Sequence, residues 1–306
     1  MTRVRSHMQL DGVLFFPVTP FTGTGELAEG VLAEHVKHGV DAGPGGVFAA
    51  CGTGEFHALE PEEYERVVRV AVEATAGKAP VFAGAGGPLP LARRYAAIAQ
   101  RAGADGVLLL PPYLVGSPPD GLVDYVEQVA SASDLPLIVY QRNNAVFTPE
   151  SAVRAANLPT VVGFKDGLGD LDQMQRIVLA VRGAVHKPFQ FFNGLPTAEM
   201  TVPAYRGIGV ELYSSAVFCF APQISLAFYD AVTTGNTSQV NTFLSEFFRP
   251  LVELRDSVPG YAVSLVKAGV RLRGLEVGSV RAPLVDPSPE HVRELDRIIA
   301  KGLELL

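Results

Sequence analysis

The sequence predicts a (β/α)8 barrel, the TIM-barrel fold, followed by a C-terminal extension of about three helices. Eight short apolar runs are each followed by an amphipathic stretch with helical periodicity. The runs are continuous rather than alternating, as parallel strands buried on both faces require. Eight such units closing on each other make a barrel. A doubly wound open sheet is the alternative, although that fold rarely needs eight equal units.

Each strand is predicted where an apolar run ends in glycine, proline or polar residues. The predicted strands lie within 12–21, 45–55, 79–87, 105–113, 135–143, 160–167, 189–194 and 207–215. The helices that follow them are predicted at 28–42, 60–77, 88–102, 119–132, 148–156, 170–182, 196–204 and 222–235. Pro61 at a first helical position, with acidic residues in the first turn, illustrates the start signals used.

The pattern changes after residue 236, where three helical stretches near 238–257, 261–274 and 288–305 follow with no strand between them. We therefore assign residues 10–236 to the barrel and residues 237–306 to the helical extension. Residues 1–9 are left out of the fold prediction. They contain two arginines but no apolar segment typical of a secretory signal.

Composition excludes several classes of function. The chain has 306 residues, 48% hydrophobic and 19% charged, as expected for a globular protein with one large barrel. Its net charge of −7 argues against nucleic acid or an anionic membrane as partner. No apolar run is long enough for a transmembrane helix. Two cysteines make no disulfide framework, so a reducing cytoplasm is the expected compartment.

The stretch "VVGFKDGLGD" (161–170) contains the most informative residue, Lys165, which ends an apolar strand. Lysine is rarely buried without a partner or a function. It could extend its ammonium to solvent, or it could pair with Asp166. It could also be a desolvated lysine whose neutral amine attacks a carbonyl group.

The ends of the other strands supply further polar groups, and in a barrel these ends meet at one mouth. Strand two ends in the glycine-rich "CGTGE" (51–55), whose N–H groups and Thr53 can cradle a carboxylate. An ordinary turn is the alternative there. Strand five ends at Tyr140, which could equally be a core aromatic residue. Ser214 and Ser215 end strand eight and could simply cap the next helix.

Together these motifs resemble the dihydrodipicolinate synthase / N-acetylneuraminate lyase superfamily. The resemblance covers nearly the whole chain, from "PVTPF" (17–21) to the C-terminal helices. "GFKDGLGD", "YQRNNAVFT" and "FNGLPTAE" are similar to the branch of 5-dehydro-4-deoxyglucarate dehydratases. Synthase relatives carry two adjacent tyrosines after strand four, but this chain has Tyr113-Leu114, so the second hydroxyl is missing. This disfavours the condensing, synthase-type reaction.

The resemblance implies a role for each matching residue. Lys165 matches the Schiff-base lysine, and Tyr140 matches the tyrosine that transfers protons beside it. Gly52 and Thr53 match the loop that holds the carboxylate of a 2-oxo acid. Gly194, Ser214 and Ser215 are expected near the distal half of the substrate. The far carboxylate and the hydroxyls also need donors, and the loop after strand five offers Arg142, Asn143 and Asn144. A surface or interface charge is the alternative for Arg142.

The implied reaction converts 5-dehydro-4-deoxy-D-glucarate to 2,5-dioxopentanoate, CO2 and water, as in D-glucarate catabolism. It needs neither metal nor organic cofactor, and the histidines and cysteines show no metal-binding spacing. The expected partner is a small sugar acid, and a homo-oligomer (dimer or tetramer) is expected. Another lysine-dependent lyase or aldolase of the same superfamily is an alternative. A barrel that binds a small acid without turning it over is another.

Overall fold

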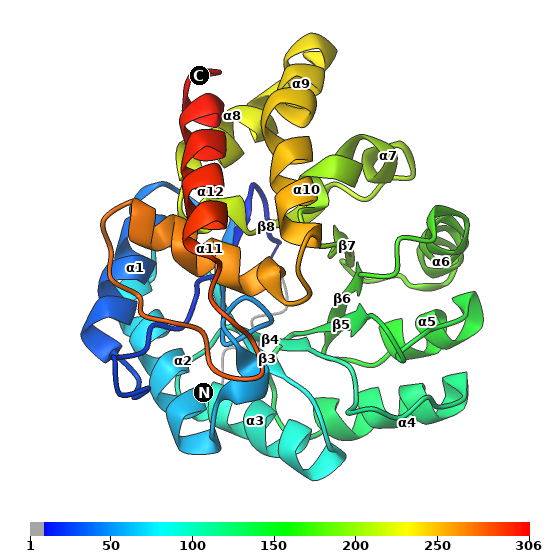
Figure 1. The fold of residues 1–306 in the computed structure, drawn as a ribbon. Coiled ribbons are helices and arrows are strands. Elements are labelled where there is room, and N and C mark those ends of the chain that lie inside the picture. The colour runs from blue at the N-terminus through cyan, green and yellow to red at the C-terminus, as the bar shows by residue number, and fades with distance from the viewer. Residues whose placement is uncertain (1–8) are drawn as a thin grey trace.

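The computed structural model describes residues 9–306 and shows a closed barrel of eight parallel strands in the order β1 to β8 (Figure 1). The strands are β1 Leu14–Phe15, β2 Gly46–Ala49, β3 Val81–Ala85, β4 Gly106–Leu109, β5 Leu137–Gln141, β6 Val161–Asp166, β7 Gln190–Asn193 and β8 Leu212–Ser215. The predicted fold class is confirmed. Of residues 1–9, which we left out of the fold prediction, residues 1–8 lie outside the described part of the chain.

The helices surround the barrel and follow the predicted order (Figure 1). They are α1 Glu29–Asp41, η1 Phe56–Ala58, α2 Pro61–Thr75, α3 Leu89–Arg101, α4 Pro119–Ala130, α5 Pro149–Ala156, α6 Leu171–Ala184, η2 Ala198–Thr201, α7 Val202–Gly207, η3 Val217–Cys219 and α8 Pro222–Thr233. Pro61 does begin α2, where Glu60 and Glu63 form a capping box.

The strands are shorter than the apolar runs that predicted them. The run at 12–21 contains a strand of only two residues, β1, and the run at 45–55 contains β2 alone. The remaining apolar residues belong to loops that are buried above the barrel, such as Phe16, Val18 and Cys51. Hydrophobicity therefore marks burial here, and the strand ends where the loop turns over the barrel mouth.

Two apolar layers lie on opposite faces of the sheet. Leu14, Phe48, Phe82, Ile138 and Phe192 fill the barrel interior, whereas residues one position away pack against the outer helices. Phe48 stacks on Phe16 at 4.5 Å and on Phe82 at 5.0 Å between ring centroids. Since successive strand residues point to opposite faces, this layering decides which strand-end residues face the mouth.

The C-terminal helices pack together on one side of the barrel (Figure 1). They are α9 Thr237–Phe243, the π-helical η4 Leu244–Phe248, α10 Arg249–Asp256, α11 Tyr261–Leu272 and α12 Pro289–Leu303. The first predicted stretch therefore contains α9, η4 and α10 in direct succession. No helix within residues 9–306 is long and apolar enough to cross a membrane.

Candidate active site

A cavity of about 1140 Å³ opens at the carboxyl ends of the strands. Its walls include eight of the nine residues that the sequence predicts for the site: Gly52, Thr53, Tyr140, Arg142, Asn143, Lys165, Gly194 and Ser214. Ser215 does not line it. The C-terminal extension also contributes to the wall, through Leu251 and Arg255 of α10 and several residues of α11.

Lys165 is a buried lysine in the wall of this cavity. Only 4% of the residue is exposed, and its Nζ lies 4.1 Å from the centroid of the Phe16 ring and 4.7 Å from that of the Tyr140 ring. The predicted alternative of a pair with Asp166 does not fit this placement. Asp166 is the next strand residue and accepts hydrogen bonds from Gln141 Nε2 at 2.7 Å and from the Tyr205 hydroxyl.

Burial lowers the pKa of the Lys165 amine to about 7, and the nearby Arg142 guanidinium adds to this effect. Cys51 would oppose the shift only as a thiolate. Burial raises the pKa of that thiol to about 12, so the thiol stays neutral near pH 7. A large fraction of Lys165 is therefore a neutral amine at neutral pH, whereas an exposed lysine is almost entirely protonated there.

Tyr140 lies directly beside Lys165, because the two residues are paired in register on β5 and β6. Its hydroxyl donates to the carbonyl oxygen of Gly194 at 2.6 Å and accepts from Arg142 Nη1 at 3.1 Å. Burial raises the pKa of the Tyr140 hydroxyl, and the Arg142 guanidinium opposes this. The phenol is thus oriented from both sides and protonated at neutral pH.

Gly194 leaves the space that Lys165 occupies. A Cβ at position 194 would lie 2.5 Å from Lys165 Cε and 2.7 Å from Tyr140 Cε2. Contacts under 3 Å force neighbouring atoms to move, so any larger residue would displace both side chains. Gly194 therefore shapes the site around the lysine, in addition to accepting the tyrosine hydrogen bond.

The loop after β2 forms the opposite wall. Its turn is closed by two backbone hydrogen bonds, from Glu55 N to Gly52 O at 3.1 Å and from Phe56 N to Cys51 O at 3.1 Å. Thr19 Oγ1 also donates to Gly54 O at 2.7 Å. We call residues 52–53 the cradle, since Gly52 and Thr53 both line the cavity opposite the polar groups of β5 and β6.

Ser214 and Ser215 point to opposite faces of β8. Ser214 has the same parity as Leu212, which belongs to the barrel interior, and it lines the cavity. Ser215 is fully buried behind the strand, where its Oγ donates to Glu199 Oε1 at 2.5 Å and lies 2.9 Å from Ser225 Oγ. The structure therefore does not bring Ser215 to the cavity, and the alternation of strand residues is the physical reason.

Comparisons with known proteins assign the chain to a family. Residues 9–302 match the sequence model of the dihydrodipicolinate synthetase family. The chain belongs to this family. The chain is an enzyme of the lyase class, since its curated relatives at 58% identity are named as dehydratases.

Curated relatives and solved structures resemble almost the whole chain. The "Probable 5-dehydro-4-deoxyglucarate dehydratase 1" of Streptomyces avermitilis is 58% identical, over 96% of this chain and 94% of the relative. A relative of the same name from Streptomyces coelicolor has the same identity and the same coverage. The crystal structure of dihydrodipicolinate synthase from Oceanobacillus iheyensis has a TM-score of 0.88, with 26% identity over 96% of this chain and 97% of that one.

Two parts of the site were missed by the sequence prediction. Phe16 covers Lys165 from the loop after β1, and its parity with Leu14 was a signal that could have placed it at the mouth. Arg255 and the residues of α11 come from the extension, about ninety residues beyond Lys165. No local pattern links them to the barrel mouth, because only the packed fold brings them there.

Proposed function

We propose that this chain is a Schiff-base-forming, decarboxylating dehydratase that converts 5-dehydro-4-deoxy-D-glucarate to 2,5-dioxopentanoate, CO2 and water, a step of D-glucarate catabolism. The observation that carries the proposal is the buried Lys165 amine, whose pKa is lowered to about 7, at the mouth of the barrel beside Tyr140. The name of the relatives that are 58% identical supports the choice of substrate.

The reaction begins with the carboxylate next to the ketone. The cradle N–H groups and Thr53 bind this carboxylate and present the ketone to Lys165. The neutral amine attacks the ketone carbon, and loss of water gives an iminium ion. The positive nitrogen then makes the neighbouring CH2 acidic, since the electrons left by its proton can enter the C=N bond.

Elimination and decarboxylation use the same electron sink. Removal of a proton from the CH2 expels the hydroxyl on the next carbon as water and leaves a conjugated iminium. The conjugated system ends at the carbon next to the one that bears the far carboxylate, so the electrons of that C–C bond can pass through it to the iminium nitrogen as CO2 leaves. Reprotonation and hydrolysis then free Lys165 and the product, 2,5-dioxopentanoate.

Tyr140 is the proposed proton-transfer group, either directly or through a water that it holds. Because the pKa of its hydroxyl is raised, the phenol is protonated at neutral pH and acts first as a hydrogen-bond donor and acid. The hydroxyl expelled in the elimination step takes this proton and leaves as water, and the phenolate so formed accepts the proton removed from the CH2, which regenerates the phenol. The Gly194 carbonyl and the Arg142 guanidinium hold the phenol in place for both transfers.

We further propose that Asn143 and Ser214 hold the departing carboxylate more closely than Arg142 does. Arg142 already donates to Tyr140. A guanidinium clamped on that carboxylate would also stabilise the charge that decarboxylation must remove, and catalysis needs stronger binding of the transition state than of the substrate. A structure with a diacid analogue tests this proposal. A bidentate contact between Arg142 and the far carboxylate would contradict it.

The proposal extends to the state of the enzyme in the cell. We propose a cytoplasmic homo-oligomer. Its support is a run of exposed apolar residues, Tyr113, Leu114 and Val115, of which the first two line the cavity and Leu114 is 80% exposed. Both cysteines are buried and unpaired, as suits a reducing compartment.

Two measurements test the proposed reaction. Sodium borohydride with pyruvate should reduce an imine on Lys165 and add the mass of the reduced adduct to the protein. A panel of 2-oxo sugar acids should then show CO2 release from 5-dehydro-4-deoxy-D-glucarate. Trapping without CO2 release would indicate a sibling lyase or aldolase. The absence of both would indicate a barrel that only binds acids.

The rate of imine formation should follow the neutral fraction of the Lys165 amine, whose pKa is about 7. Below that pH the neutral fraction of Lys165 falls about tenfold per unit, and above it the fraction approaches one. We expect the initial rate of borohydride trapping with pyruvate, corrected for borohydride decomposition, to rise from pH 5.5 to 7 and to level off by pH 8.5. A rate that continues to rise towards pH 10 would show that the amine has an ordinary pKa.

Thr53→Val should weaken substrate binding while leaving the chemistry largely intact. The substitution keeps the volume of the side chain and removes one hydroxyl from the cradle. Loss of a hydrogen bond to a charged group costs about 1.5–3 kcal/mol, which corresponds to a rise in KM of about tenfold to 150-fold. Steady-state kinetics would measure KM and kcat separately. An unchanged KM would rule out Thr53 as a carboxylate ligand.

A further inference from the structure

Glu55 is a buried acid next to the cradle with no role in the reaction above. It follows Gly54, two residues after Thr53, and none of its surface is exposed. Its backbone has a φ of 54°, in the left-handed region that residues other than glycine seldom adopt. A buried carboxylate in a strained backbone conformation persists only where surrounding contacts hold it.

Those contacts come from the C-terminal extension. Lys267 of α11, also fully buried, places its Nζ 2.6 Å from Glu55 Oε1 and donates to Ser279 O at 2.9 Å. The backbone N–H of Arg281 donates to Glu55 Oε2 at 2.8 Å. The extension thus reaches both oxygens of a residue that ends the loop after β2, more than two hundred positions earlier in the chain.

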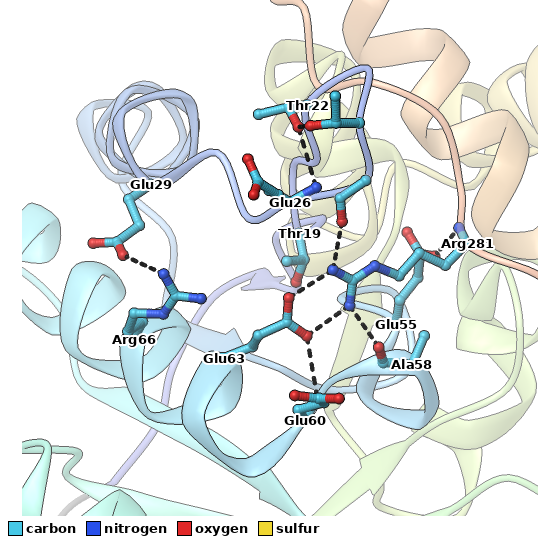
Figure 2. Close-up of polar contacts among 12 residues, drawn as sticks. Thr19, Thr22, Glu26, Glu29, Glu55, Ala58, Glu60, Glu63, Arg66 and Arg281 are labelled. Carbon is cyan, nitrogen blue, oxygen red and sulfur yellow. Dashed lines mark hydrogen bonds and ion pairs between the residues drawn. The ribbon is translucent and has the colours of Figure 1, made fainter.

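The side chain of Arg281 anchors the segment whose backbone contacts Glu55 (Figure 2). Its guanidinium forms two hydrogen bonds of 2.6 Å with Glu63 of α2 and donates to Ala58 O at 2.7 Å and Gly25 O at 2.6 Å. The Phe21 ring contacts both cations, with its centroid 4.2 Å from Lys267 Nζ and 3.9 Å from the Arg281 guanidinium carbon. The segment that carries the Glu55 contact is therefore anchored to α2 and to the loop after β1.

This arrangement leaves the cradle little freedom to move. Thr53 is joined by one residue to Glu55, which Lys267 and Arg281 hold, and Gly54 O is held by Thr19 Oγ1. Breaking one side of a buried ion pair leaves an uncompensated charge, so the loop can shift only at a high cost in free energy. A displacement of about 1 Å in a positioning group can cost about 100-fold in rate.

We propose that Lys267, acting through Glu55, is a positioning residue for the cradle, so that the C-terminal extension sets the affinity of the site for the carboxylate beside the ketone. This inference rests on the proposed function, because it assigns the cradle to the carboxylate of a 2-oxo acid. It goes further in placing a specificity-determining contact on α11, outside the barrel.

The test compares two ketones that differ in the carboxylate. Pyruvate has the group that the cradle binds, and hydroxyacetone lacks it. The variant Glu55→Gln/Lys267→Met removes both charges of the pair together, a change that proteins often tolerate without loss of stability. We expect the pyruvate concentration that half-saturates borohydride trapping to rise about tenfold. The trapping rate with hydroxyacetone should stay within about twofold of wild type.

Lys187→Met is the matched control. Lys187 is half-buried before β7, at the opposite end of the barrel, and donates to Leu158 O. It should leave trapping of both ketones unchanged. Glu55→Asp keeps both charges of the pair and only shortens the reach of the carboxylate, and its trapping of the two ketones is interpreted in the same way if the double variant does not fold.

The outcomes separate the inference from the proposed function. Loss of pyruvate affinity with hydroxyacetone trapping retained supports the positioning role. If trapping of both ketones weakens equally, the Glu55–Lys267 pair only maintains the fold. If trapping of neither ketone weakens, the cradle does not depend on the pair. Both results overturn the inference. Wild-type protein that traps no pyruvate would instead refute the Schiff-base function.

Discussion

Lys165→Ala should abolish turnover of the sugar diacid while leaving the fold intact. The substitution removes the amine that attacks the ketone, and neither neighbour can replace it, because the Cys51 thiol and the Tyr140 hydroxyl both have raised pKa values. Loss of a catalytic nucleophile reduces kcat by roughly 10⁶-fold in a well-measured hydrolase, and we expect a loss on that order. A coupled assay for 2,5-dioxopentanoate, with CO2 release in parallel, would measure it.

Stability provides the control for that experiment. The pKa of Lys165 is lowered from 10.5 to about 7, so the unfolded chain binds a proton more readily than the native one between these values. Burial of the protonated amine therefore lowers the free energy of unfolding. This loss of stability is fully present below pH 7 and shrinks as the pH rises towards 10.5. Lys165→Met, which fills the same space without a charge, should therefore raise Tm at pH 7 relative to wild type.

Lys165→Arg should be inactive as well, because a guanidinium stays protonated and cannot attack a ketone. Activity within tenfold of wild type in any of these variants would contradict the Schiff-base mechanism. Inactivity with a lowered Tm in Lys165→Met would leave misfolding as the explanation and would contradict the electrostatic account of the buried amine.

The positions of Lys165 and Tyr140 at the barrel mouth could be predicted because both residues lie on regular strands. Tyr140 and Lys165 are each the residue before the last in parallel strands, and the carboxyl ends of parallel strands meet at one mouth. The same regularity would have separated Ser214 from Ser215, since residues of opposite parity face opposite sides of the sheet. Their side chains differ in role although their residue type is the same.

The contacts that hold the loops around the cavity could not be predicted from strand regularity. Asn144 had the same chemistry as Asn143 in the sequence, but its side chain donates to Pro112 O at 3.2 Å and also to Val115 O. Glu55 and Lys267 meet only because α11 packs over the mouth. Such pairs depend on tertiary packing between distant segments, and neither hydrophobic periodicity nor motif spacing contains that information.

Tyr140→Phe should lower kcat by about 10²–10⁴, the usual contribution of general acid–base catalysis. The substitution leaves the ring beside Lys165 and removes only the hydroxyl that donates to Gly194 O and accepts from Arg142 Nη1. Imine formation with pyruvate should slow less than turnover, because the elimination step also needs the proton that the phenol supplies. The variant should therefore still be trapped by borohydride while releasing little CO2.

A second substitution separates proton transfer from the hydrogen bonds that orient it. Arg142→Met removes the donor to Tyr140 Oη and leaves the phenol and its bond to Gly194 O in place. It also removes the nearby positive charge that helps to lower the pKa of Lys165, so that pKa should rise and the trapping profile should move to lower amine reactivity at neutral pH, with its plateau at higher pH. We expect Arg142→Met to reduce kcat less than Tyr140→Phe does.

If Tyr140→Phe instead raised KM and left kcat unchanged, Tyr140 would be a binding residue, and the proton would have to come from another group at the mouth.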